Sequence, residues 1–200
     1  MPRKVPRPYH HGDLRSTLLR EAQAMVREVG LEGLSLRQLG LRAGVSASAL
    51  YHHFDNKNAL LCALAEEGFA TLDQVLQEAA SDVSGNLRDQ TLRFVRAYVG
   101  YAAAHPEIYD LMFGRALWKA GEPTESLRTF AFSTFRRYVD YVSATDPRVG
   151  GGKAGLRHAQ ARWATVHGLC RLVIDGVYTD GADLLGMTAA AADLLVGRDG

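Results

Sequence analysis

Apolar residues recur at helical spacing in one segment of the chain after another. The first clear stripe runs from Leu18 to Val29 and ends at Gly30, and the longest occupies about Lys57 to Ala80. The pattern predicts an all-α chain of about nine helices. We expect these over residues 12–30, 35–43, 46–54, 57–80, 87–104, 106–117, 123–142, 156–178 and 182–196.

Residues 34–61 predict two short helices around a tight turn. Ser35 can cap the first helix, and Gly44 can end it in the left-handed conformation that a helix C-terminus often adopts. Val45 then packs the turn onto the core, and Ser46 caps the second helix. Two helices joined in this way are typical of a DNA-reading helix-turn-helix.

The second of these helices is expected to present a polar face. Ala49, Leu50 and Phe54 should lie toward the interior, because helical spacing puts them on one side. Lys57 should stand near the start of the next helix, where backbone N–H groups and the helix dipole favour a phosphate. The residues left largely outward are Ala47, Ser48, Tyr51 and His52.

The charge of the chain becomes informative when the sequence is divided. The net charge is +1, but residues 1–60 carry nine Lys or Arg against five Asp or Glu, and residues 61–200 carry fourteen against seventeen. The positive charge is therefore concentrated in the N-terminal third, which includes a proline-rich arm over residues 1–11. Since this excess is modest, tight DNA binding would require two such units, as in a dimer on a palindromic site.

The capped helix, the Gly-Val-Ser turn and the ending Tyr-x-His-Phe-x-x-Lys resemble the TetR family of transcriptional regulators. Here the ending is formed by Tyr51, His53, Phe54 and Lys57. The resemblance implies phosphate contacts from Tyr51, His53 and Lys57 and a base contact from Arg37. The complete set of expected DNA-contacting residues is Ser35, Arg37, Ser46, Ala47, Ser48, Ala49, Tyr51, His52, His53 and Lys57.

This sequence departs from the family pattern where bases are read. Ala47, Ser48 and Ala49 are small and offer one hydroxyl group, so they provide little direct hydrogen bonding to bases. We therefore expect thymine-methyl contacts, His52, Arg37 and the N-terminal arm to contribute more of the sequence specificity. A Gly stands at position 40 in place of the usual Ala, which costs up to about 1 kcal/mol of helix propensity.

The second half of the chain resembles the WHG-type ligand-binding domain of some TetR-like regulators. The resemblance rests on His105 to Gly114 and on Trp163, His167 and Gly168, and it implies a small-molecule effector without identifying it. Aromatic residues of this region are candidates for an apolar pocket, although ordinary core packing explains each of them equally well. The candidates are Phe94, Tyr98, Tyr101, Phe113, Trp118, Phe132, Phe135, Trp163 and His167.

The helix predicted over residues 156–178 carries apolar residues on more than one side, and the last helix is rich in alanine and leucine, whose small side chains allow close approach. A helix with more than one apolar side must be covered both by its own domain and by something else, and a second copy of the chain is the natural cover. The position of these helices matches the pair with which TetR-like proteins dimerise. The candidate interface residues are Leu169, Leu172, Val173, Leu184, Leu185, Ala191, Leu194 and Leu195.

Other functional classes find little support in the sequence. The segment from Gly150 to Gly155 formally fits a dinucleotide fingerprint, but no strand is predicted before it, so we interpret residues 146–155 as a flexible connection. The pairs His10-His11 and His52-His53 lack further ligands for a metal, and no catalytic set is recognisable. We therefore expect no enzyme activity, no catalytic residues, no metal and no cofactor.

Cellular context follows from two further features. Cys62 and Cys170 form no CxxC pair, and no apolar run is long enough for a membrane span or a signal peptide. We expect a reduced, cytoplasmic protein without membrane contact.

The sequence thus predicts a three-helix head over residues 1–56, a linking helix over 57–80 and a ligand-binding and dimerisation bundle over 81–200. As a homodimer, it would place two heads in successive major grooves of a palindromic operator, about 34 Å apart. Repression controlled by a small molecule is the expected function. Activation by the same fold, and a helical protein-binding adaptor without DNA binding, remain as alternatives.

Overall fold

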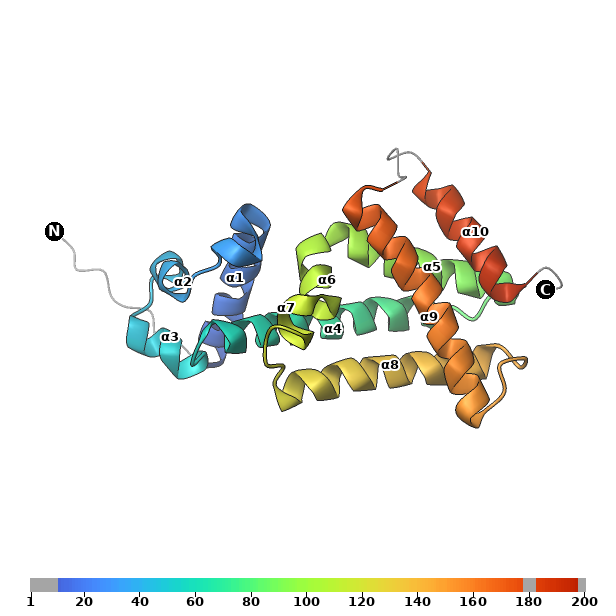
Figure 1. Cartoon of the computed structure of the whole chain (residues 1–200), viewed down its shortest axis with the longest axis horizontal. Coiled ribbons are helices and arrows are strands. Elements are labelled where there is room, and N and C mark those ends of the chain that lie inside the picture. The colour runs from blue at the N-terminus through green and yellow to red at the C-terminus, as the bar shows by residue number, and fades with distance from the viewer. Residues whose placement is uncertain (1–10, 178–182, 198–200) are drawn as a thin grey trace.

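The computed structural model describes residues 11–177 and 183–197, and every regular element in these ranges is an α-helix. Nine of the helices have seven residues or more, and α7 is a single turn, which confirms the predicted all-α fold (Figure 1). The elements are α1 (His11–Gly33), α2 (Leu36–Ala43), α3 (Ala47–His53), α4 (Lys57–Ser81), α5 (Leu87–Ala104), α6 (Pro106–Phe113), α7 (Arg115–Trp118), α8 (Glu125–Thr145), α9 (Gly152–Asp175) and α10 (Leu184–Val196).

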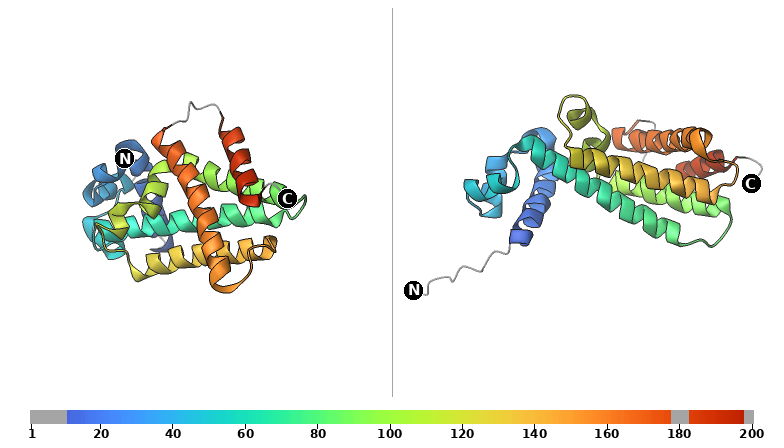
Figure 2. Two further views of the ribbon diagram at one scale, coloured as in Figure 1. Left: turned by 45° about the vertical axis from the view of Figure 1, so that its right-hand side comes forward. Right: turned by 90° about the horizontal axis from the view of Figure 1, so that it is seen from below.

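The helices form a small head and a larger body that share α4. In the head, α1, α2 and α3 gather near the beginning of α4, and the rest of α4 runs through the body against α5, α6 and α8. In the body, α9 crosses over α5 and α8, and α10 packs against α5. A view from below shows an elongated molecule with the head at one end (Figure 2). The one helix common to both parts can therefore transmit a displacement between them.

Apolar residues at helical spacing form the core of the head and the core of the body, because the hydrophobic effect favours the removal of one face of each helix from water. In the head, the fully buried side chains are Leu18, Leu19, Ala22, Val26, Leu39, Leu50 and Leu60. In the body they include Leu64, Leu72, Val95, Val99, Tyr109, Leu111, Met112, Leu117 and Leu127. None of the described helices is long and apolar enough to cross a membrane.

The helix-turn-helix forms as its turn residues predict. Gly44 ends α2 with φ 67°, in the left-handed region, and the N–H of Val45 donates to the carbonyl oxygen of Gly40 at 3.0 Å. Ser46 caps α3, since its hydroxyl oxygen accepts a hydrogen bond from the N–H of Ala49 at 3.2 Å. Ser35 stands at the N-cap position of α2, but its side chain makes no capping hydrogen bond, so the predicted cap is present only in its backbone.

Several predicted helix ends are corrected by the structure. The first helix continues past Gly30, where the backbone leaves the helical conformation, to Gly33, and Val29 lies exposed rather than in the core. The helix predicted over residues 106–117 is divided at Gly114 into α6 and α7. Apolar spacing could not reveal these breaks, because it continues across both of them.

The connection predicted to be flexible is instead pinned to the body. Asp146 is 1% exposed, and its carboxylate accepts hydrogen bonds from Arg148 at 2.7 Å and from Arg162 of α9. Arg162 also donates to the carbonyl oxygen of Leu195 at 2.6 Å. The Arg148 guanidinium, by hydrogen bonding, holds the pKa of the Asp146 carboxyl well below its usual range. Residues 146–151 therefore fasten the start of α9 to the end of α10.

Candidate functional site

The outward face of α3 is small and polar. Tyr51 is 51% exposed, and Ala47, Ser48 and His52 are exposed as well, whereas Leu50 on the opposite side is buried. Ala49 is half-buried, consistent with its predicted inward position. Among the described helices, α3 packs mainly against α2, and its polar face is exposed.

Three cationic groups of the head differ in their availability. Arg37 on α2 is exposed and makes no hydrogen bond or ion pair with the described residues. Lys57, the first residue of α4, donates from Nζ to the carbonyl oxygen of Glu32 at 3.2 Å and keeps two further N–H donors. Arg42 is bound by two carboxylates of α1, with Glu28 at 2.5 Å and Glu21 at 2.9 Å. Hence Arg37 and Lys57 keep N–H donors that the described residues do not use, while Arg42 joins α1 to α2.

The remaining candidate DNA contacts are placed as follows. Ser35 is half-buried at the start of α2, and Ser46 is exposed but engaged by its capping bond. His53 is half-buried at the end of α3, with its ring 5.5 Å from that of His52 at an interplanar angle of 72°. The N-terminal arm over residues 1–10 lies outside the described residues. The described candidates thus lie on α2 and α3, at the N-cap positions of these two helices and at the first residue of α4.

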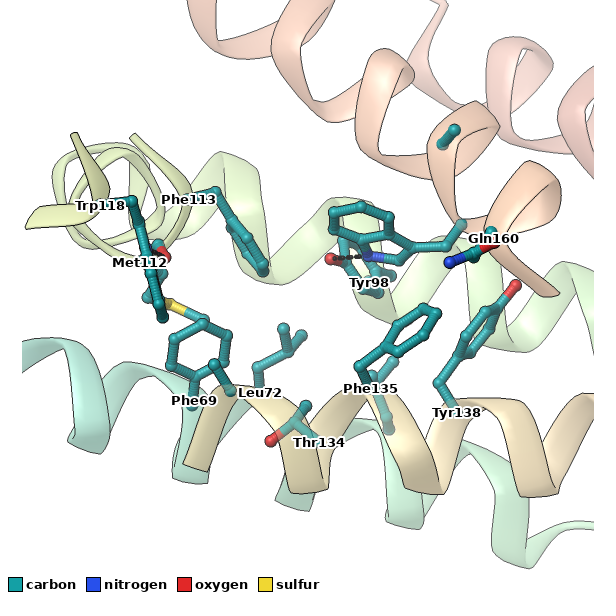
Figure 3. A pocket seen from close by; sticks show the side chains of 14 residues that line it. Phe69, Leu72, Tyr98, Met112, Phe113, Trp118, Thr134, Phe135, Tyr138 and Gln160 are labelled. Carbon is teal, nitrogen blue, oxygen red and sulfur yellow. Dashed lines mark hydrogen bonds between the residues drawn. The ribbon is translucent and has the colours of Figure 1, made fainter. Parts of the chain in front are cut away.

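The body contains an apolar cavity of about 580 Å³, within the range usual for small-molecule sites (Figure 3). α4, α5, α6, α7, α8 and α9 all contribute to its wall. Among the predicted pocket residues, the structure brings five together on this wall: Tyr98, Phe113, Trp118, Phe135 and Trp163. The sequence reasoning missed Phe69, Leu72, Leu76, Met112, Ala131, Thr134, Tyr138, Gln160 and Ala164.

Four predicted pocket residues do not line the cavity. Phe132 is 68% exposed on the outer side of α8, because it lies three positions before Phe135 and outside the packed stripe of that helix. Phe94 stacks on Tyr141 with ring centroids 5.2 Å apart. Tyr101 is buried behind the wall, and His167 stacks against Trp163 with centroids 5.0 Å apart. Helical spacing alone cannot separate a residue on the cavity wall from one just behind it.

A chain of hydrogen bonds lies behind the cavity. The indole N–H of Trp163 donates to the hydroxyl oxygen of Tyr98 at 3.0 Å, and the hydroxyl oxygens of Tyr98 and Tyr109 are 3.4 Å apart. The Tyr109 hydroxyl lies 2.6 Å from Nδ1 of His167. Burial, with a smaller contribution from Arg171, lowers the pKa of His167, so the neutral imidazole can accept this hydrogen bond. α5, α6 and α9 are therefore joined by their buried polar groups.

A close approach joins α4 to α6. A Cβ atom added at Gly68 would lie 2.7 Å from both Cγ2 of Ile108 and Sδ of Met112, so α6 packs directly on the α4 backbone. The carbonyl oxygen of Gly68 accepts a hydrogen bond from the Tyr101 hydroxyl at 2.9 Å. Since Met112 also lines the cavity, the position of α4 depends on the cavity wall.

The candidate dimer residues on α9 and α10 include several exposed leucines. Leu194 is 71% exposed, Leu185 68% and Leu172 40%. A shallow apolar hollow between the two helices is lined by Leu169, Leu172 and Leu194 together with smaller residues: Ala164, Thr165, Gly168, Ala190 and Ala191. Of the other candidates, Leu169 is buried, and Val173, Leu184, Ala191 and Leu195 are half-buried. The face is apolar and open over much of its area, as an unpaired interface would be.

Two family models match the chain. The model described as "Bacterial regulatory proteins, tetR family" matches residues 18–64, and the model described as "Tetracyclin repressor-like, C-terminal domain" matches residues 91–196. The second match covers the body but carries a description other than WHG, so the WHG-type assignment stays a prediction.

Curated proteins give the same result. The tetracycline repressor protein class A from transposon 1721 of Escherichia coli is 29% identical, over 84% of this chain and 82% of that protein. The class C repressor of Escherichia coli is 52% identical, but over only 26% of this chain and 24% of its own length. The repressor AcnR of Corynebacterium diphtheriae is 31% identical over 68% of this chain and 60% of its own length.

Solved structures extend the similarity to nearly the whole fold. A protein of unknown function from Rhodococcus sp. RHA1 is 35% identical and superposes with a TM-score of 0.81 over 96% of this chain and 97% of its own. AibR, solved with isovaleryl coenzyme A and operator DNA, gives a TM-score of 0.63 over 92% of this chain and 98% of its own. At 17% identity, the likeness to AibR concerns the fold alone.

Proposed function

Because the chain belongs to the tetR family of bacterial regulatory proteins and is a DNA-binding transcriptional regulator, we propose that it acts as a ligand-responsive repressor. As a homodimer in the cytoplasm, the protein binds a palindromic operator and catalyses no reaction. The tetracycline repressors and AcnR, which it resembles, are named as repressors. AibR is a structural neighbour solved with both isovaleryl coenzyme A and operator DNA.

The proposed DNA contacts divide into two kinds. Tyr51, His53 and Lys57 contact phosphates and so fix the register of the head on the duplex. Arg37, which is exposed and has no partner among the described residues, reaches a guanine edge through its two-donor fork. The small side chains Ala47 and Ser48 let α3 lie close to the base edges, where they make methyl and hydroxyl contacts rather than long-range hydrogen bonds.

The single observation that carries ligand control is the double role of α4. Its first residue, Lys57, belongs to the head, and Phe69, Leu72 and Leu76 of the same helix line the cavity. A ligand that fits the cavity better in one setting of α4 shifts the population of head positions toward that setting. In a dimer this changes the separation of the two heads and therefore their fit to two half-sites.

The proposed functions are assigned to the three segments predicted from the sequence. Residues 1–56, together with Lys57, bind DNA. Residues 57–80 connect the two parts and supply Phe69, Leu72 and Leu76 to the cavity wall, and residues 81–200 supply the rest of the effector site and bind the second subunit. The leucines exposed on α9 and α10 supply the apolar surface that a symmetric pairing would bury.

Footprinting on DNA from the chain's own locus tests the DNA half of the proposal. The full-length protein should protect a palindromic segment, and a double variant Tyr51→Ala, Lys57→Ala should lose that protection. A matched control is Phe132→Ala, Arg136→Ala, which removes an exposed aromatic and an exposed cation from α8 of the body. Equal protection by both double variants would contradict the assignment of the DNA-binding surface.

Transcription from the protected promoter in a purified system distinguishes repression from activation. A repressor lowers the transcript level when it occupies the site, and an activator of the same fold raises it. A rise in transcript would overturn the repressor proposal and leave DNA binding intact.

A further inference from the structure

We propose that the cavity binds an uncharged, largely aromatic molecule whose hydrogen-bonding group lies at the end of the cavity formed by Tyr138 and Gln160. The inference rests on the proposed function, because it names the chemical class of the effector for the same site. It excludes ligands that need a carboxylate, a phosphate, an ammonium group or a chelated metal ion to be buried in the cavity.

The cavity wall carries no charged side chain among the described residues. None of the fourteen described residues that line the cavity is Lys, Arg, His, Asp or Glu. The nearest elements do carry cations, but Arg137 is paired with Asp73 at 2.6 Å and Arg162 is paired with Asp146. A charged ligand would therefore lose its hydration without gaining a partner, which is strongly unfavourable.

The polar groups of the wall are not equally available to a ligand. The Tyr98 hydroxyl already accepts from Trp163, and the indole N–H of Trp118 already donates to the carbonyl oxygen of Met112 at 2.7 Å. The Thr134 hydroxyl accepts a long hydrogen bond from Arg137 at 3.5 Å. These three groups are engaged within the protein.

Tyr138 and Gln160 are different. Tyr138 is 8% exposed and Gln160 is exposed, and neither the Tyr138 hydroxyl nor the Gln160 amide makes a hydrogen bond with the described residues. Burial raises the pKa of the Tyr138 phenol, so its hydroxyl stays protonated at neutral pH and can donate. Because the Tyr138 hydroxyl still contacts solvent, a ligand carbonyl or hydroxyl can replace water as its hydrogen-bond partner. Figure 3 shows Tyr138 and Gln160 at one end of the cavity.

The rest of the cavity suits a planar apolar body. Phe69, Met112 and Trp118 form the opposite end (Figure 3). Between the two ends, the rings of Phe113 and Phe135 stand 5.8 Å and 6.0 Å from the ring of Trp163. Aromatic faces and a polarisable thioether favour a flat aromatic guest over a flexible alkyl chain.

Matched naphthalenes test the proposal on the full-length protein. The fluorescence of bound N-phenyl-1-naphthylamine reports occupancy, and 2-acetylnaphthalene and 2-naphthoate compete for the site at pH 7.5. We expect the neutral ketone to bind at least tenfold more tightly than the carboxylate of the same ring. Equal affinity, tighter binding of the carboxylate, or no binding of either compound would overturn the proposal.

Two variants locate the polar end. Tyr138→Phe should weaken 2-acetylnaphthalene about threefold to tenfold and leave 2-methylnaphthalene, which has no hydrogen-bonding group, unchanged. Gln160→Lys should strengthen 2-naphthoate at least fivefold. Its control is Gln74→Lys, which adds the same charge at an exposed position of α4 outside the cavity and should not change 2-naphthoate binding. Equal weakening of both neutral naphthalenes by Tyr138→Phe would contradict the assigned orientation.

Operator binding, measured on the same samples, separates this proposal from the proposed function. Selective binding of the neutral probe without any change in operator affinity supports the ligand class and contradicts the effector role of the site. A failure to bind any operator DNA, with the same probe selectivity, contradicts the proposed function and leaves the ligand class standing.

Discussion

Gly68 of α4 and Met112 of α6 lie so close that a methyl group on Gly68 would overlap the Met112 sulfur, 2.7 Å from it. Met112 lines the cavity, and α4 leads to the head, so this contact joins the two functional parts of the molecule. The carbonyl oxygen of Gly68 is in turn held by Tyr101. The spacing between α4 and α6 is therefore fixed at a point where neither helix can approach further.

Gly68→Ala should destabilise the protein by about 1–3 kcal/mol, because the added methyl group forces α4 and α6 apart. Gly100→Ala is the matched control: Gly100 lies in α5, and a Cβ atom there would meet open space, so the change should stabilise the helix by up to about 1 kcal/mol. Urea unfolding measures the free energy of unfolding of both variants. Operator affinity should fall for Gly68→Ala alone, and an unchanged affinity would show that this contact does not set the head position.

Lys57→Gln should weaken operator and non-specific DNA binding by similar factors, because a phosphate contact carries no sequence information. For a dimer, the slope of log affinity against log salt should become shallower by about 2. Arg136→Gln, an exposed cation on α8, should leave the slope unchanged. Because Lys57 also holds the carbonyl oxygen of Glu32, a melting curve should accompany the titration. A change confined to one DNA sequence would point to base reading instead.

Asp146→Asn should destabilise the protein by about 3–5 kcal/mol at pH 7, since it leaves the buried Arg162 guanidinium without its carboxylate. The folded-state pKa of Asp146 is depressed, so its contribution is present above the ordinary carboxyl pKa of about 4 and is lost as pH falls toward the lowered value. The difference in the free energy of unfolding between the variant and the parent protein should therefore become smaller below about pH 4. Asp175→Asn, in an exposed pair with Arg171, should cost less than about 1 kcal/mol.

Leu194→Glu should abolish dimerisation if α9 and α10 form the interface, because it places a charge on the apolar hollow. Sedimentation should then show a monomer, and operator affinity should fall steeply as one head loses its partner. Val83→Glu changes an equally exposed residue in the connection between α4 and α5 and should leave the dimer intact. A stable dimer of the Leu194 variant would assign the interface to another surface.

The helix-turn-helix could be predicted closely because its determinants are local. Gly44 and Ser46 act within four residues of their own positions, and the spacing of Leu39 and Leu50 identifies the buried face. The same reasoning placed Lys57 at the start of a helix, where the structure has it. Ser35 shows the limit: its residue type permits a capping hydrogen bond that the side chain does not make.

The cavity and the connection before α9 depend on contacts that are distant in sequence. Phe132 and Phe135 are chemically alike, and only the packing of α4 and α9 against α8 decides that Phe135 lines the cavity. A glycine-rich composition predicts flexibility for residues 146–155. In the structure, however, the Asp146 carboxylate accepts a hydrogen bond from Arg162, sixteen residues later in the chain. Gln160 lies three residues before Trp163, and that helical spacing was a usable signal that it shares the same face.

The hydrogen bonds behind the cavity give it one stiff wall and one compliant wall. Trp163, Tyr98, Tyr109 and His167 lock α9, α5 and α6 into a single frame. The facing wall, from α4 and α8, meets the cavity mainly through apolar side chains such as Leu72 and Phe135, and Asp73 and Arg137 tie these two helices to each other. Because α4 and α8 are tied to each other, a ligand too large for the resting cavity would displace these two helices as one unit. The size of the ligand would therefore set the angle at which α4 holds the head.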